Sequence, residues 1–171
     1  GKLTYINKKG NIIWQEKIAN EIALRKLNID FMNRAYFYAY TSNTQKGANG
    51  IAKSGTNSQM ISKNDPFPSQ KFSLIVFPEK PATVFERHTG IRVVVANASH
   101  QNMEFDAQDN RLNMVVQALS PSGEWKDIEY LPVSHGNNYH VLTLKQNEYW
   151  SFATPKYEGA TKTKLRVKLT Y

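Results

Sequence analysis

The last hundred residues of the chain consist of short, apolar-rich runs that recur about every ten residues and are separated by turn residues. The runs predicted to be strands are Phe72–Phe77, Ala82–Glu86, Ile91–Ala98, Leu112–Leu119, Trp125–Leu131, His140–Leu144, Tyr149–Ala153 and Thr163–Tyr171. Strands at this spacing are typical of an antiparallel β-sandwich or barrel. The turn residues at 120–123 (Ser-Pro-Ser-Gly) predict a hairpin between the runs that precede and follow them. No helical stretch separates the runs, which argues against a parallel α/β fold.

The strongest single strand signal is the alternation at the C-terminus. The basic residues Lys162, Lys164, Arg166 and Lys168 alternate with threonine, leucine and valine. Successive side chains of a strand point to opposite faces, so this pattern predicts one basic face and one apolar face. The basic face would suit an anionic partner. Lysines also protect an exposed sheet edge from aggregation, which is the simpler explanation.

The N-terminal part is less regular. Leu3–Ile6 and Asn11–Ile13 flank a four-residue loop ending in glycine, which predicts a short hairpin. From Trp14 to Leu27, apolar residues recur four apart among good helix formers, and we expect a short amphipathic helix there. A strand is the alternative for this segment, because Ile18 and Ile22 also share a strand parity.

Three tyrosines form a candidate binding platform. Tyr36, Tyr38 and Tyr40 share one face of a predicted strand, opposite Phe37 and Ala39. Since Phe37 and Ala39 can supply the core side, the tyrosine row can lie outside. Sugar rings and nucleobases both stack on such rings. In contrast, we expect Trp125 and Trp150 to be core residues.

Residues 42–70 differ in kind from the rest of the chain. Polar residues and glycine dominate them, and such a stretch buries too little apolar surface to order itself well. A loop of this length in a compact domain is usually functional or disordered. We therefore expect residues 1–171 to form a single all-β domain, a jelly-roll-like antiparallel β-sandwich with a short N-terminal helix and a long mobile loop at 42–70.

Composition excludes several classes of function. The chain has no cysteine, which removes disulfides, thiolate metal sites and cysteine nucleophiles. No apolar run approaches the ~18 residues that a membrane-spanning helix needs. The net charge of +8 can favour anionic partners, although a lysine-rich composition spread along the chain explains it more simply. Abundant lysine and asparagine suggest a bacterial source, with no signal peptide visible at the N-terminus.

Catalytic signatures are weak. His135 and His140 flank a Gly-Asn turn, but zinc needs a third ligand that no spacing supplies, so we expect no metal. The carboxylates Glu124, Asp127, Glu129 and Glu148 could form a glycoside-hydrolase pair, although chance alone would produce such pairs in this chain. No Gly-X-Ser-X-Gly elbow or phosphate-binding loop is present, so we expect no catalytic residue and no cofactor.

The pattern as a whole favours a non-catalytic interaction module of the bacterial cell envelope. Such a module would be periplasmic, on the cell surface or secreted, although the lack of cysteine suits a cytoplasmic protein equally. It would bind a glycan or a partner protein through Tyr36, Tyr38 and Tyr40. The alternatives are an electrostatic binder of nucleic acid or an anionic polymer, acting through Lys162, Lys164, Arg166 and Lys168, and a glycan hydrolase or metal-dependent enzyme.

Overall fold

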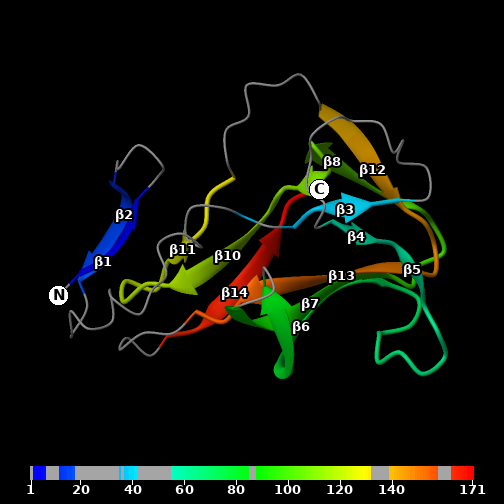
Figure 1. The fold of residues 1–171 in the computed structure, drawn as a ribbon, viewed down its shortest axis with the longest axis horizontal. Coiled ribbons are helices and arrows are strands. Elements are labelled where there is room, and N and C mark those ends of the chain that lie inside the picture. The colour runs from blue at the N-terminus through cyan, green and yellow to red at the C-terminus, as the bar shows by residue number, and fades with distance from the viewer. Residues whose placement is uncertain are drawn as a thin grey trace. The chain divides into compact units, whose positions relative to one another are not determined.

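The computed structural model describes residues 2–6, 12–17, 35, 37–41, 55–84, 88–131, 139–157 and 163–171, with the backbone alone at 2–6, 12–17 and 88 (Figure 1). Every regular element in these ranges is a β-strand, and the sheets are antiparallel apart from one two-residue parallel pair. The prediction of an all-β chain with antiparallel sheets is therefore confirmed.

The chain divides into two compact units. The first contains Gly1–Ala35, Met114–Val133 and Lys156–Lys168, and the second contains Tyr36–Asn113, Ser134–Pro155 and Leu169–Tyr171. The expectation of one domain over residues 1–171 stays a prediction.

The described residues of the first unit form two sheets. β1 (Lys2–Ile6) pairs antiparallel with β2 (Ile12–Lys17), so the predicted hairpin is confirmed. The other sheet has the order β11 (Trp125–Asp127), β10 (Met114–Leu119) and β14 (Leu165–Leu169). The predicted hairpin of β10 and β11 is also confirmed, and Gly123 in its turn has a φ of 85°, which glycine adopts without strain.

The second unit contains a four-stranded sheet with the order β5 (Gln59–Met60), β13 (Glu148–Pro155), β7 (His88–Asn97) and β6 (Phe72–Val84). The sequence places the turn residues Pro78 and Pro81 between two predicted strands, whereas the structure joins both runs in one strand whose pairing is interrupted at this point. Both prolines lie within β6, whose register against β7 shifts between Phe77 and Pro81. A strand at the end of a sheet tolerates proline because one side of its backbone has no partner strand to lose.

A three-stranded sheet in the same unit has the order β12 (Tyr139–Leu144), β8 (Met103–Gln108) and β9 (Arg111–Leu112). A bridge from Tyr38 to Arg111 adds the preceding segment to its edge. That segment runs into β3 (Ala39–Tyr40), which pairs with β4 (Thr56–Asn57). On β8 the exposed Glu104 and Asp106 alternate with the buried Phe105 and Ala107. The three-stranded sheet therefore has one polar side and one apolar side.

Aromatic rings connect the apolar side of this arrangement to β13. The Phe105 and Trp150 ring centroids lie 5.4 Å apart, and those of Phe37 and Phe152 lie 5.5 Å apart, both edge to face. Trp150 is fully buried, and its indole N–H donates to the Tyr40 carbonyl oxygen at 3.0 Å. Burial of Trp150 and Phe152 confirms their predicted place in the core.

Two N-terminal expectations are corrected or fall outside the described ranges. Trp14 to Lys17 lie in β2 and not in the predicted helix, because they continue the pairing with β1. Residues 18–27 of that helix, and residues 42–54 of the predicted loop, lie outside the described residues. The remainder of the loop contributes β4 and β5, and Phe67 packs edge to face on Tyr149 with centroids 5.0 Å apart.

Candidate functional site

Four paired residues form a row across the polar side of the second unit. Tyr139 on β12 pairs with Gln108 on β8, Gln108 pairs with Arg111 on β9, and Arg111 pairs with Tyr38. Directly paired residues of antiparallel strands point to the same face, so these four side chains share one side of the sheet. We call Tyr139, Gln108, Arg111 and Tyr38 the tyrosine-ended row. With strands about 4.8 Å apart, the row spans about 14 Å.

A tight turn fixes the middle of the tyrosine-ended row. Asp109 and Asn110 connect β8 to β9 with φ values of 53° and 64°, as a two-residue type I′ hairpin requires. This turn places Gln108 opposite Arg111, and Arg111 Nη2 donates to Gln108 Oε1 at 3.2 Å. Asparagine and aspartate adopt such positive φ values more readily than other residues with a side chain.

Buried polar groups surround this turn. Gln108, Asn110 and Arg111 are 9%, 6% and 7% exposed. Asn110 Oδ1 lies 2.7 Å from His140 Nε2. Among the described residues, the Gln108 side-chain nitrogen Nε2 is buried without a hydrogen-bond partner. A buried amide donor left in this way costs about 1–3 kcal/mol of stability.

Of the three tyrosines predicted as a platform, Tyr38 belongs to this row, and Tyr40 shares its strand parity. Phe37 and Ala39 are 1% and 0% exposed, which confirms that they supply the core side. Tyr38 and Tyr40 are half-buried, and the Tyr40 ring packs over Gly55, where a Cβ atom would meet it at 1.9 Å. Tyr36 lies outside the described residues. Tyr139, which pairs with Gln108 in this row, is 72% exposed.

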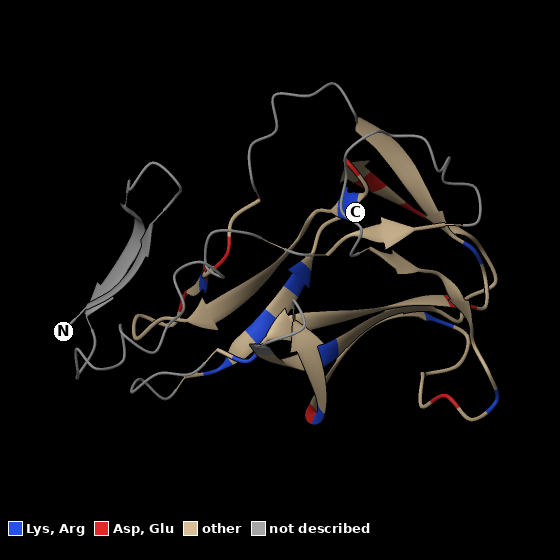
Figure 2. Ribbon diagram, viewed as in Figure 1, with Lys and Arg blue, Asp and Glu red and all other residues tan. Residues whose placement is uncertain are grey.

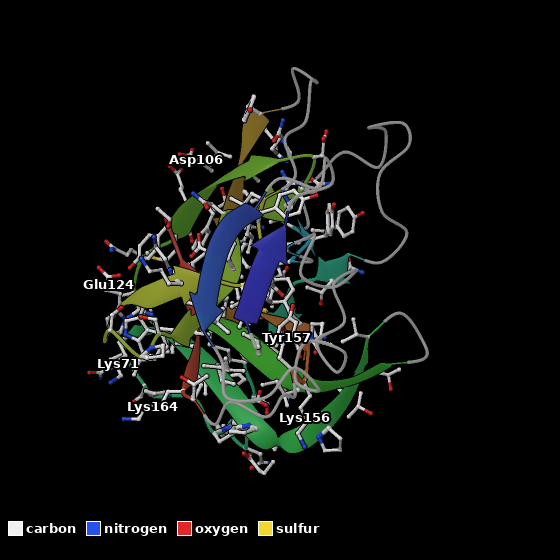
Figure 3. All side chains as sticks on the ribbon, turned by 90° about the vertical axis from the view of Figure 1, so that its left-hand side faces the viewer. Lys71, Asp106, Glu124, Lys156, Tyr157 and Lys164 are labelled. Carbon is white, nitrogen blue, oxygen red and sulfur yellow. The ribbon has the colours of Figure 1, made fainter. Side chains whose placement is uncertain are left out.

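The predicted basic strand lies in the first unit. Lys164, Arg166 and Lys168 are all exposed, and Figure 2 shows their positive charge along β14. The Lys164 side chain points outward at the margin of the view in Figure 3. Lys162 lies outside the described residues. The apolar face of β14 is only partly covered, because Leu165 is 43% exposed while Val167 and Leu169 are half-buried.

Arg166 is held in place by its neighbours. Its Nε donates to Gln117 Oε1 at 2.8 Å, and its guanidinium carbon lies 4.4 Å from the centroid of the Trp125 ring. Gln117 in turn donates from Nε2 to Asp127 Oδ1 at 2.6 Å. Trp125 is half-buried under this guanidinium, so its predicted place in the core is wrong. The cause is its position on the short end strand β11, where a cation covers one face of the ring.

Glu129 is a buried carboxyl group in the same unit. It is 1% exposed, its Oε2 accepts from the Val116 N–H at 2.9 Å, and its Oε1 accepts from the Tyr157 hydroxyl at 2.5 Å. Burial raises the pKa of Glu129 to about 7, and the charge of Asp127 adds to the rise, whereas the two hydrogen bonds oppose it. The side chain supplies an acceptor to β10 just beyond the point where β11 ends at Asp127.

The other carboxylates named for a hydrolase have structural partners. Glu124 is exposed and forms an ion pair with Lys126 at 2.8 Å, which lowers the pKa of Glu124 through that hydrogen bond and charge. Glu148 accepts from the Lys145 N–H at 3.3 Å. No group of three or more potential metal ligands occurs among the described residues, and His135 lies outside them. No helix within the described ranges is long and apolar enough to cross a membrane.

Sequence reasoning missed Gln108, Arg111 and Tyr139. The signal was present, because Met103, Phe105 and Ala107 alternate with polar residues as a half-buried strand does. Comparison with known proteins adds no relative: no protein-family model, no curated protein and no solved structure matches the chain.

Proposed function

We propose that this chain is a non-catalytic interaction module of the bacterial cell envelope that binds a glycan on the face carrying the tyrosine-ended row. The observation that carries the proposal is the buried, unpartnered Nε2 donor of Gln108 in a row that ends in a tyrosine on either side. Sugars offer hydroxyl oxygens in the plane of the ring and apolar C–H faces. Amide donors serve the hydroxyls, and tyrosine rings serve the C–H faces.

The fold that supports this role is, we propose, a jelly-roll-like β-sandwich formed by the second unit. The contacts of Phe105 with Trp150 and of Phe37 with Phe152 support two sheets packed by their apolar sides. Such packing leaves the opposite side of β12, β8 and β9 for a ligand, which would meet the exposed Tyr139 and Val141 first because Gln108 is buried. Asp106, two residues before Gln108 on that side, is exposed and points away from the ribbon (Figure 3).

The test is a glycan array followed by titration of any oligosaccharide that binds. Gln108→Glu keeps an oxygen that can accept from Arg111 and replaces the Nε2 donor with a charged acceptor oxygen, so we expect it to abolish binding while the protein stays folded. Tyr139→Ala should weaken binding by loss of a stacking ring. Met60→Ala is the matched control, because Met60 is 68% exposed on β5 and should leave binding unchanged.

Two results would overturn the proposal. One is an empty array at millimolar oligosaccharide. The other is a bound sugar whose affinity is the same for the wild type, Gln108→Glu and Tyr139→Ala. Capture of a protein that Tyr139→Ala no longer retains would assign the same face to a partner protein in place of a glycan.

A further inference from the structure

The exposed face of β14 has the features of a binding surface for a charged polymer. Leu119 N–H donates to the Lys164 carbonyl at 3.0 Å, and this register sets Arg166 opposite Gln117 on β10. Lys164, Arg166 and Lys168 therefore project from one side of the strand. Alternate residues of a strand lie about 6.8 Å apart, so the three charges span roughly 14 Å in a straight line.

Within the part of the chain that the structure describes, no carboxylate forms an ion pair with Lys164, Arg166 or Lys168. The ion pair found within the described residues joins Lys126 to Glu124 and involves none of the three. Asp127 reaches Arg166 only through the Gln117 amide, which accepts from one and donates to the other. A row of exposed cations without ion-pair partners attracts an anionic chain.

Arg166 gives the row a fixed centre. Its Nε donates a hydrogen bond to Gln117, which is only 6% exposed, and its planar guanidinium group lies over the Trp125 ring. These contacts use neither terminal nitrogen, and two terminal guanidinium nitrogens have the paired geometry that matches a carboxylate. Protection of an edge against aggregation requires charge alone and no such fixation.

The same contact disfavours nucleic acid. Proteins that bind single strands without sequence preference combine basic side chains with aromatic rings on which bases stack. On this surface the candidate ring is Trp125, and the Arg166 guanidinium covers its face at 4.4 Å. We propose that the face of β14 that carries Lys164, Arg166 and Lys168 binds an acidic polysaccharide, a linear chain of sugars that bear carboxylates. The proposal rests on a different surface from the glycan site of the second unit.

Titration of the whole chain with polygalacturonate, single-stranded DNA of similar length and neutral dextran tests this inference. We expect polygalacturonate to bind most tightly, with an affinity that falls as sodium chloride increases. Lys164→Gln with Lys168→Gln should raise its dissociation constant about tenfold or more. The matched control, Lys63→Gln with Lys71→Gln, removes the same charge from exposed positions and should change it less than about twofold.

Arg166→Lys separates a fixed guanidinium from charge alone, because it keeps the charge and loses the contacts to Gln117 and Trp125. We expect it to weaken polygalacturonate binding, whereas Tyr139→Ala should leave it unchanged. Equal loss in the two double variants, tighter binding of DNA, or no binding of polygalacturonate at low salt would each overturn the inference. Thermal unfolding of each variant reports whether the fold is intact.

Discussion

Replacement of Glu129 should remove a pH dependence of the free energy of unfolding, because in the wild type this dependence comes from the Glu129 carboxyl group. The Glu129 carboxyl has a pKa of about 7 in the folded chain against an ordinary value of 4.5. Between these values the folded state binds more protons than the unfolded state, so the free energy of unfolding falls as pH rises. The contribution is fully present below pH 4.5 and is lost as pH rises through about 7.

The size of the effect follows from the same interval. About 2.5 pH units, at about 1.4 kcal/mol for each, give about 3.5 kcal/mol. Solvent does not screen this effect appreciably, because the Glu129 side chain is only 1% exposed. Glu129→Gln resembles the protonated form: its oxygen can accept from Val116 N–H and its amide can donate to the Tyr157 oxygen. The variant should therefore keep the interactions and lose the titration.

The assay is urea unfolding of the wild type and Glu129→Gln at several values between pH 4.5 and pH 8, followed by tryptophan fluorescence. We expect the wild type to lose about 3 kcal/mol over this range relative to the variant. Two further variants give opposite shifts. Asp127→Asn removes a nearby charge and should move the wild-type transition to lower pH, whereas Tyr157→Phe removes a hydrogen bond to the carboxylate and should move it higher. Parallel pH profiles for the wild type and Glu129→Gln would refute the reasoning.

Two other substitutions test the second unit. In Gly90→Ala, the added Cβ would lie 2.5 Å from the Thr154 carbonyl oxygen and 2.6 Å from Val84 Cγ2, so β13 or β7 must shift; we expect a loss of about 1–3 kcal/mol in urea unfolding, and unchanged stability would contradict that packing. Asn97 is fully buried, and its Nδ2 donates to the carbonyls of Leu144 and Gln101, both at 2.9 Å. Asn97→Ala should cost roughly 2–4 kcal/mol, and Asn97→Asp should cost more at neutral pH because a carboxylate would face two carbonyl oxygens; a milder effect for Asn97→Asp would count against these bonds.

Local alternation was enough to predict much of the fold. The alternation of residues 36–40 correctly assigned Phe37 and Ala39 to the core, because the residues on the buried face of a strand recur at every second position. The hairpin of β10 and β11 could be predicted from its turn residues, because the turn also is a local feature of the sequence. Trp125 was misassigned because an aromatic residue on an end strand has the same local pattern as a core residue.

Long-range contacts could not be predicted in this way. The hydroxyl bonded to Glu129 belongs to Tyr157, which is 28 positions away, and no local pattern connects them. Arg111 is buried because the segment at Tyr38 pairs with it, although arginine is seldom buried and the two lie far apart in the chain. Such burial is decided by which strands become neighbours, and that information lies in the topology of the sheet.

One register fixes both the core and the tyrosine-ended row of the second unit. A shift of β8 by one residue would exchange its faces, so Phe105 would leave Trp150 and Gln108 would leave Arg111 together. The turn at Asp109 and Asn110 prevents that shift, since two successive positive φ values suit a two-residue loop. Gln108 accepts from the buried Arg111 through Oε1, whereas its Nε2 atom is buried without a partner and costs stability. The strand that packs Phe105 into the core therefore also fixes the place of the buried Gln108 side chain.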